Sequence, residues 1–208
     1  MFKQLLEQAF PGRDYATPGG FLQLLFVQFG VLLAGLAAAT FVASWAGDET
    51  SGRLEMALAT PLSRIRWAVA GGACMMVNVA VFVAIVAAGT GIGVATSDDE
   101  IITPMIGSLI LAVFAAAMVG IGLAVGGFFR TGWAAPAVVI VVLLTWLLQL
   151  LGRLFNLPQV VQDLALTTHL GETMVGSWDW GGVAICAVLA FGGIALGAWG
   201  FQRRDLLR

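Results

Sequence analysis

The segment Gly47–Arg66, GDETSGRLEMALATPLSRIR, combines charged residues with a regular apolar spacing. Its apolar residues recur at intervals of three and four, as they would on one face of a helix: Leu54, Ala57, Leu58 and Leu62. Asp48 and Glu49 suit the N-terminus of such a helix, and Pro61 suits its end. A short amphipathic helix of this kind can dock into a groove of another protein through its apolar face. The alternative is a helix that lies on a membrane surface.

Residues that could support catalysis or bind metals are sparse. The chain has one histidine, His169, which excludes H-E-x-x-H and every His-pair metal site. Cys74 and Cys186 lie inside apolar runs and do not indicate a disulfide framework. G-x-S-x-G is absent, and His169 and Asp163 have no nucleophile beside them. Lys3 lies in no glycine-rich loop, so a phosphate-binding G-x-x-x-x-G-K-[ST] loop is excluded. We therefore expect no catalytic site, metal or cofactor here, and any ATP must bind to another subunit.

The composition of the chain indicates that most of its residues lie within a lipid bilayer. The 208 residues are 60% hydrophobic and 11% charged, with a net charge of -2 and a mean hydropathy of +0.95. No basic run could follow a phosphate backbone, which argues against nucleic acid as a partner. Five uncharged runs are long enough to cross a hydrocarbon core of about 30 Å. They are Phe21–Ala46, Trp67–Ala95, Ile101–Phe129, Trp133–Leu151 and Trp180–Phe201. The sequence predicts an all-α integral membrane protein with five transmembrane helices, in one domain over residues 1–208.

The distribution of basic residues predicts the orientation in the membrane. Seven arginines lie on one side: Arg53, Arg64, Arg66, Arg130, Arg203, Arg204 and Arg208. Only Lys3, Arg13 and Arg153 lie on the other side. Because positively charged loops stay cytoplasmic, we expect a cytoplasmic C-terminus and an N-terminus outside the bacterial plasma membrane. Residues 47–66 would then be cytoplasmic, and the opposite topology is the alternative.

Two segments are expected on the outer side. Residues 1–20 lack the apolar core and cleavage site of a signal peptide, so they are interpreted as an amphipathic outer segment. Residues 152–177 are half apolar but too polar to span, and Asn156–Pro158 and Gly171 would break them into two short helices. This pair could lie on the membrane surface or enter it.

Polar and small residues inside the spans could line a pathway or join helices. Gln28, Asn78 and Gln149 carry amides at membrane depth, where such groups usually bond across helices. The pairs Gly35/Ala39, Gly122/Gly126 and Gly193/Gly197 would allow close helix contact, either within one bundle or with a second transmembrane subunit. The spans contain no ionisable residue of the kind that ion-coupled transporters keep. Energy for any transport would have to come from outside the bilayer, and the apolar spans suit a hydrophobic or amphiphilic substrate.

The segment Gly47–Arg66 resembles the coupling helix of ABC-2 type permeases, E-x-x-G-T-L-E-x-L-L-x-x-P-x-S-R, and is called the coupling segment below. The matching residues are Glu49, Gly52, Leu54, Glu55, Leu58, Pro61 and Arg64, with Ser63. Arg53 is a departure, because the family often has threonine there. The resemblance extends over nearly the whole chain, to the second half of two-halved permeases described as exporters of polyketide antibiotics. It implies that the matching residues contact a cytoplasmic ABC ATPase, and that residues 152–177 form a re-entrant hairpin before the last span.

Each half of such a permease is expected to have six spans, so the resemblance implies that the first of six is missing before residues 1–20. A split gene, a truncated product or a partner chain that supplies the helix would each explain this. The predicted function is the permease subunit of an ATP-driven exporter of compounds such as antibiotics or lipids, partnered by an ABC ATPase and a second transmembrane half. The alternatives are a truncated permease that acts as a non-transporting scaffold or assembly partner and, disfavoured by the lack of a catalytic set, an intramembrane enzyme.

Overall fold

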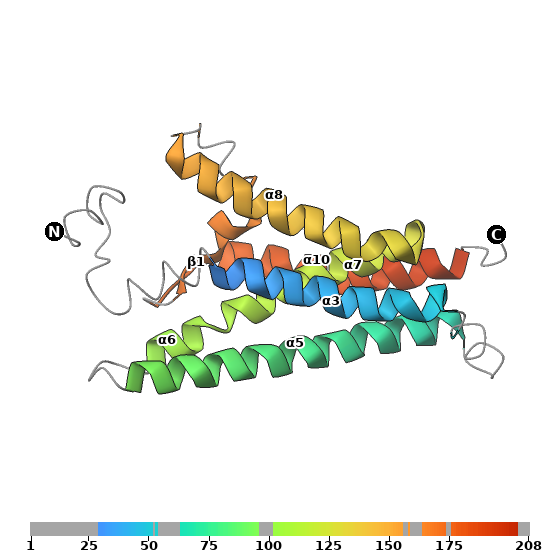
Figure 1. Ribbon diagram of the computed structural model, residues 1–208, viewed down its shortest axis with the longest axis horizontal. Helices are drawn as coiled ribbons and strands as arrows, with labels where there is room; N and C mark the ends of the chain where they lie inside the picture. The colour runs from blue at the N-terminus through green and yellow to red at the C-terminus, as the bar shows by residue number, and fades with distance from the viewer. Residues whose placement is uncertain are drawn as a thin grey trace.

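The computed structural model is a bundle of long helices (Figure 1). It describes residues 29–51, 53, 63–95, 102–155, 158, 164–173 and 176–203. The long helices are α3 (Val31–Thr50), α5 (Arg64–Ala95), α7 (Ile110–Phe128), α8 (Ala134–Leu154) and α10 (Trp180–Arg203). The short elements are α6 (Ile102–Gly107), η2 (Thr131–Trp133), η3 (Leu166–Leu170), β1 (Gly171–Glu172) and β2 (Ser177–Trp178).

Five helical stretches are long and apolar enough to cross a membrane, which confirms the predicted all-α membrane fold. They are Val31–Glu49, Arg64–Ala95, Ile102–Phe128, Thr131–Gly152 and Trp180–Arg203. Helices suit this environment because each satisfies its backbone hydrogen bonds internally, where lipid offers no partner. The first eight residues of the first predicted span, 21–28, lie outside the described residues.

The uninterrupted apolar run Ile101–Phe129 predicted one continuous helix for the third span. The structure divides this span into two helices, α6 and α7. Ser108 and Leu109 separate α6 from α7, and the Ser108 Oγ donates a hydrogen bond to the Met105 carbonyl oxygen over 2.7 Å. The amides of Leu109, Leu111 and Ala112 bond to carbonyls three residues back, at 3.0–3.1 Å, which is 3₁₀ geometry. Serine favours such a local break because its hydroxyl competes for backbone carbonyls. Hydropathy alone cannot show this, because the residues remain apolar on average.

Helix α7 lies at the centre and is the most buried span. Figure 1 shows α3, α7 and α10 side by side, with α5 along one side and α8 along the other. Helix α8 diverges from the others toward the end of the bundle that holds η3 (Figure 1). That end is called the η3 end, and the opposite end, where α3 and α10 finish and α5 begins, is called the Trp45 end.

Glycines bring the backbones of α7 and α10 into direct contact. A methyl group at Gly193 would overlap with the Gly120 carbonyl oxygen, and one at Gly197 would lie 2.5 Å from the Leu123 carbonyl oxygen. From the other side, a methyl group at Gly127 would overlap with the Gly197 carbonyl oxygen. Side chains can turn away from a clash but backbone carbonyls cannot, so these positions require glycine.

The opposite face of α7 receives side chains from α3 and α8. A methyl group at Gly122 would lie 2.8 Å from the Val42 Cγ2 atom and 2.9 Å from the Val138 Cγ2 atom. Gly35 of α3 faces Val142 in the same way, at 2.5 Å. The three small-residue pairs predicted from the sequence therefore act within this bundle.

The connection into α10 contains a small β-hairpin that the sequence did not predict. Gly171 pairs with Trp178 and Glu172 with Ser177 in antiparallel register. Gly171 (φ 77°) and Gly176 (φ 82°) adopt the left-handed backbone that favours glycine, and this allows the chain to turn. Before it, η3 packs its backbone at His169 against Gly182 of α10. Of the two expected short helices in residues 152–177, the described part shows the 3₁₀ helix η3, whereas residues 156–157 and 159–163 are outside it.

The α7–α10 contact predicts a position-specific loss of stability. Gly193→Ala should lower the free energy of unfolding by about 1–3 kcal/mol, because the added methyl group forces the two backbones apart. Gly192→Ala is the matched control, since no atom lies within 4 Å of a methyl group there among the described residues. Thermal unfolding of both variants in detergent tests this, and equal melting temperatures would contradict it.

A second prediction concerns orientation. Ser51 and Ser177 are exposed at opposite ends of the bundle, and both are single-atom changes from cysteine. In a background with Cys74→Ala and Cys186→Ala, a membrane-impermeant maleimide added outside spheroplasts should label Ser177→Cys and spare Ser51→Cys, because the basic residues favour a cytoplasmic Trp45 end. Labelling of only Ser51→Cys under these conditions would reverse the topology.

Candidate functional site

The coupling segment leaves and re-enters the bundle at the Trp45 end. Glu49 lies on the last turn of α3, and Arg64 is the first residue of α5. Helices α3 and α5 pack against each other, so both ends of the segment are anchored in one bundle. The other predicted contact residues lie outside the described residues, and their roles remain predictions: Gly52, Leu54, Glu55, Leu58 and Pro61.

The expectation that Asp48 and Glu49 begin a helix was wrong. Helix α3 continues through them to Thr50, and the Ser51 amide still bonds to the Gly47 carbonyl oxygen over 3.0 Å. No proline interrupts this turn, so the helix of the span runs on past the apolar run. The two acidic residues therefore lie at the negative end of the helix dipole, where carboxylates are disfavoured.

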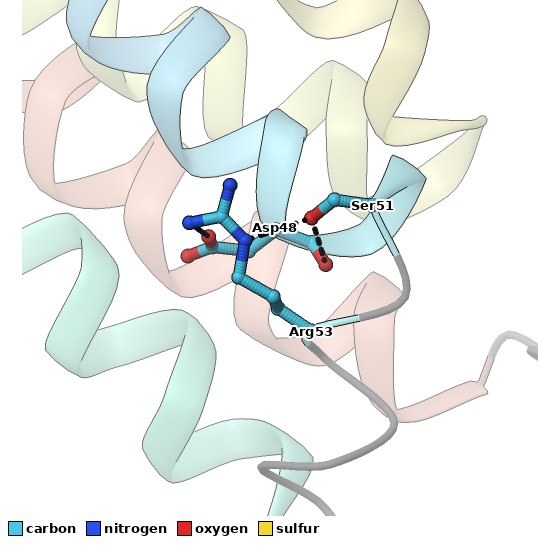
Figure 2. A network of polar contacts seen from close by, with 3 residues as sticks. All are labelled: Asp48, Ser51 and Arg53. Atoms are coloured by element: carbon cyan, nitrogen blue, oxygen red, sulfur yellow. Dashed lines mark hydrogen bonds and ion pairs between the residues drawn. The ribbon is translucent and has the colours of Figure 1, made fainter.

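Arg53 compensates this unfavourable placement of charge. Figure 2 shows its side chain folded back toward the end of α3. Its Nη1 atom lies 3.9 Å from the Asp48 Oδ1 atom, and its Nε donates a hydrogen bond to the Ser51 Oγ over 3.1 Å. The Ser51 hydroxyl in turn lies 3.5 Å from the Asp48 carbonyl oxygen. Arginine in place of threonine at this position therefore adds an exposed cation that pairs with Asp48 at the C-terminal end of α3.

Ser63 caps the start of α5. Its Oγ accepts a hydrogen bond from the Arg66 amide over 3.3 Å, and its carbonyl oxygen accepts one from the Trp67 amide over 3.0 Å. A serine N-cap satisfies a backbone donor that the helix itself cannot pair. The two arginines in the first turn, Arg64 and Arg66, lie at the positive end of the helix dipole, where cations are disfavoured. Ser63 thus fixes where helix α5 begins.

Three aromatic rings form a cluster next to the end of α3 and the start of α5. Trp45 and Trp67 stack with ring centroids 5.0 Å apart and an interplanar angle of 25°. Phe201, on the last turn of α10, lies 6.2 Å from Trp45 and 5.1 Å from Trp67. The sequence did not predict this cluster, because tryptophans at the ends of spans are typical of the membrane interface. Trp45 is instead 6% exposed and packs inside the bundle.

The polar residues predicted inside the spans occupy different environments. Gln149 is buried on the face of α8 that also carries Thr145, and no partner for its Oε1 atom lies among the described residues. Asn78 is exposed on α5, near the middle of that helix. Gln28 lies outside the described residues. The described residues therefore do not bring these amides together into one site.

The fold and the site define an all-α membrane protein whose charged segment is anchored at one end of the bundle. Residues 1–202 match the family model described as "Multidrug efflux system permease Rv1217c, C-terminal domain", and the chain belongs to this family of ABC-2 type permeases. No curated protein matches the chain. The family establishes a membrane permease of the efflux type.

The exposure of the Asp48–Arg53 pair predicts a small energetic effect. The two side chains are 43% and 69% exposed, and such ion pairs typically contribute about 0–1 kcal/mol. Arg53→Thr, which introduces the residue common in the family, should therefore leave the melting temperature in detergent nearly unchanged, with any difference vanishing in high salt. A large, salt-independent loss of stability would show that Arg53 makes a stronger contact than the ion pair.

Proposed function

We propose that this chain is the permease subunit of an ATP-driven exporter of hydrophobic or amphiphilic compounds, such as antibiotics or lipids. A separate cytoplasmic ABC ATPase would hydrolyse ATP and dock on the coupling segment. The observation that carries the proposal is the family match over residues 1–202, together with the coupling residues Glu49 and Arg64 at one end of the bundle. In this proposal the Trp45 end is cytoplasmic.

The geometry of the helix ends supports a docking role. Asp48 and Arg53 are exposed beside the point where the chain leaves α3, and Ser63 is exposed where it returns. The polar residues at these ends offer charge and hydrogen bonds to a partner, while the sequence pattern places Leu54 and Leu58 one turn apart on one helical face. Apolar contacts would then supply most of the binding energy, and charges would set the orientation of the ATPase.

The exposed position of Asn78 supports a further transmembrane partner. An amide on the outward face of a span has neither water nor a helix to bond with in lipid, which is unfavourable. A second transmembrane half would cover this face of α5. Gln28 and Gln149 are proposed to bond between helices or to contact the transported compound.

The experiment that tests the function is reconstitution. The permease is co-expressed with a candidate ABC ATPase, purified as a complex and placed in vesicles with a fluorescent amphiphilic compound. We expect ATP-dependent movement of the compound across the membrane, and no ATP hydrolysis by the permease alone, because it has no phosphate-binding loop. A complex that hydrolyses ATP but moves none of a panel of such compounds would favour the scaffold function.

The coupling segment allows a residue-level prediction. Burying Leu58 against the ATPase should contribute about 1.5–3 kcal/mol, so Leu58→Asp should abolish recovery of the complex in detergent. Glu55→Ala should reduce recovery less, because an exposed charge pair contributes about 0–1 kcal/mol. Both variants should insert normally, as the positions lie between spans. If the segment lies on the membrane surface instead, wild type and both variants will recover the ATPase equally.

A further inference from the structure

Two stacked aromatic rings, Trp45 and Trp67, flank the two ends of the coupling segment. Trp45 precedes Glu49 by one helical turn and shares its face of α3. Trp67 lies three residues after Arg64, in the first turn of α5. Since the two rings stack at 5.0 Å, the chain that leaves toward the coupling segment and the chain that returns from it are held together just inside the bundle.

Phe201 connects this pair to α10. Its side chain is fully buried, and its ring lies within 6.2 Å of both indoles. Helix α10 is in turn packed backbone to backbone against α7 through Gly193 and Gly197. The three rings, called the aromatic junction, therefore link the ends of the coupling segment to the most tightly packed helix pair of the bundle.

Trp45 is also fixed edge-on in a slot between α5 and α7. A methyl group at Gly71 would lie 2.6 Å from its Cδ1 and Nε1 atoms, and one at Gly126 would lie 2.8 Å from its Cζ3 atom. One edge of the indole thus packs against α5 at Gly71, and the opposite edge packs against α7 at Gly126. No acceptor for its Nε1 atom lies among the described residues, so shape rather than hydrogen bonding holds the ring.

We infer that the aromatic junction transmits movement of the coupling segment to α7 and α10, with Trp45 as its positioning residue. The inference rests on the proposed function, because it concerns how an ATPase would drive this permease. A displacement of the segment shifts Trp45 and Trp67 together, since closely packed interiors respond by discrete shifts rather than by continuous deformation. Trp45 can shift only if α5 or α7 shifts with it, and Phe201 passes the movement to α10.

Gly71→Ala tests the junction without altering the coupling segment. The added methyl group displaces the Trp45 indole, so the complex with the ATPase should form and hydrolyse ATP while the amount of compound transported per ATP falls roughly 2- to 30-fold. Gly192→Ala on α10 is the control, because a methyl group there meets no atom within 4 Å among the described residues, and it should transport like wild type. Trp45→Phe is a second, independent variant: its shorter ring no longer reaches Gly126, so it should also lower transport per ATP while the complex still forms and hydrolyses ATP.

The outcomes separate the inference from the function on which it rests. Equal transport per ATP for Gly71→Ala and Gly192→Ala would overturn the inference while leaving the proposed function intact. A parallel loss of melting temperature, complex recovery and transport in both Gly71→Ala and Trp45→Phe would also overturn it, since the cluster would then serve only folding. Absence of ATP-dependent transport by the wild-type complex would refute the proposed function, and the inference with it.

Discussion

The backbone contact between α7 and α10 is the constraint on which the rest of the bundle depends. In lipid the hydrophobic effect does not drive helices together, so close packing must hold them. Gly120 and Gly127 on α7, with Gly193 and Gly197 on α10, let carbonyl oxygens of each helix reach the backbone of the other. Such proximity gains dispersion and weak Cα–H···O contacts along the length of the two helices. Any larger side chain at these positions removes that gain, because a backbone cannot turn aside.

This contact determines what the other face of α7 can accept. Gly122 and Gly126 lie on that face and form shallow sites that Val42, Val138 and Trp45 fill. Valine is well suited to such sites because its branched side chain has few rotamers to lose. Helices α3 and α8 therefore pack at a distance set by side chains, whereas α10 packs at a distance set by backbones. The glycines on two faces of α7 thus set how closely α3, α8 and α10 pack against it.

The sequence predicted the spans well and the tertiary neighbours poorly, for physical reasons. Hydropathy identified five spans because lipid excludes unpaired backbone, so long apolar runs have one structural outcome. It could not predict the break at Ser108, which depends on a local hydrogen bond, or the continuation of α3 through Asp48 and Glu49. A tryptophan at the end of a span is typical of the membrane surface, and only the positions of Gly71 and Gly126 show why Trp45 is buried instead. Of the coupling residues, Glu49 lies at the end of α3 and Arg64 at the start of α5, and their contact with an ATPase, like that of Leu54 and Leu58, remains a prediction.

The unequal packing of the helices bears on how a movement would spread through them. Helices α7 and α10 share so close a contact that they are expected to move as one body, because separating them would lose their backbone contact along several turns. Helix α5 contacts the bundle along a single stripe that includes Gly72, Val79 and Thr90, and leaves its other faces exposed. A helix held along one stripe can slide or tilt at lower cost than one enclosed on all sides. Because Trp67 belongs to α5 and Phe201 to α10, the aromatic junction lies where the loosely held helix meets the rigid pair. A displacement that begins at the coupling segment would therefore tilt α5 against α7 and α10 before it could separate them.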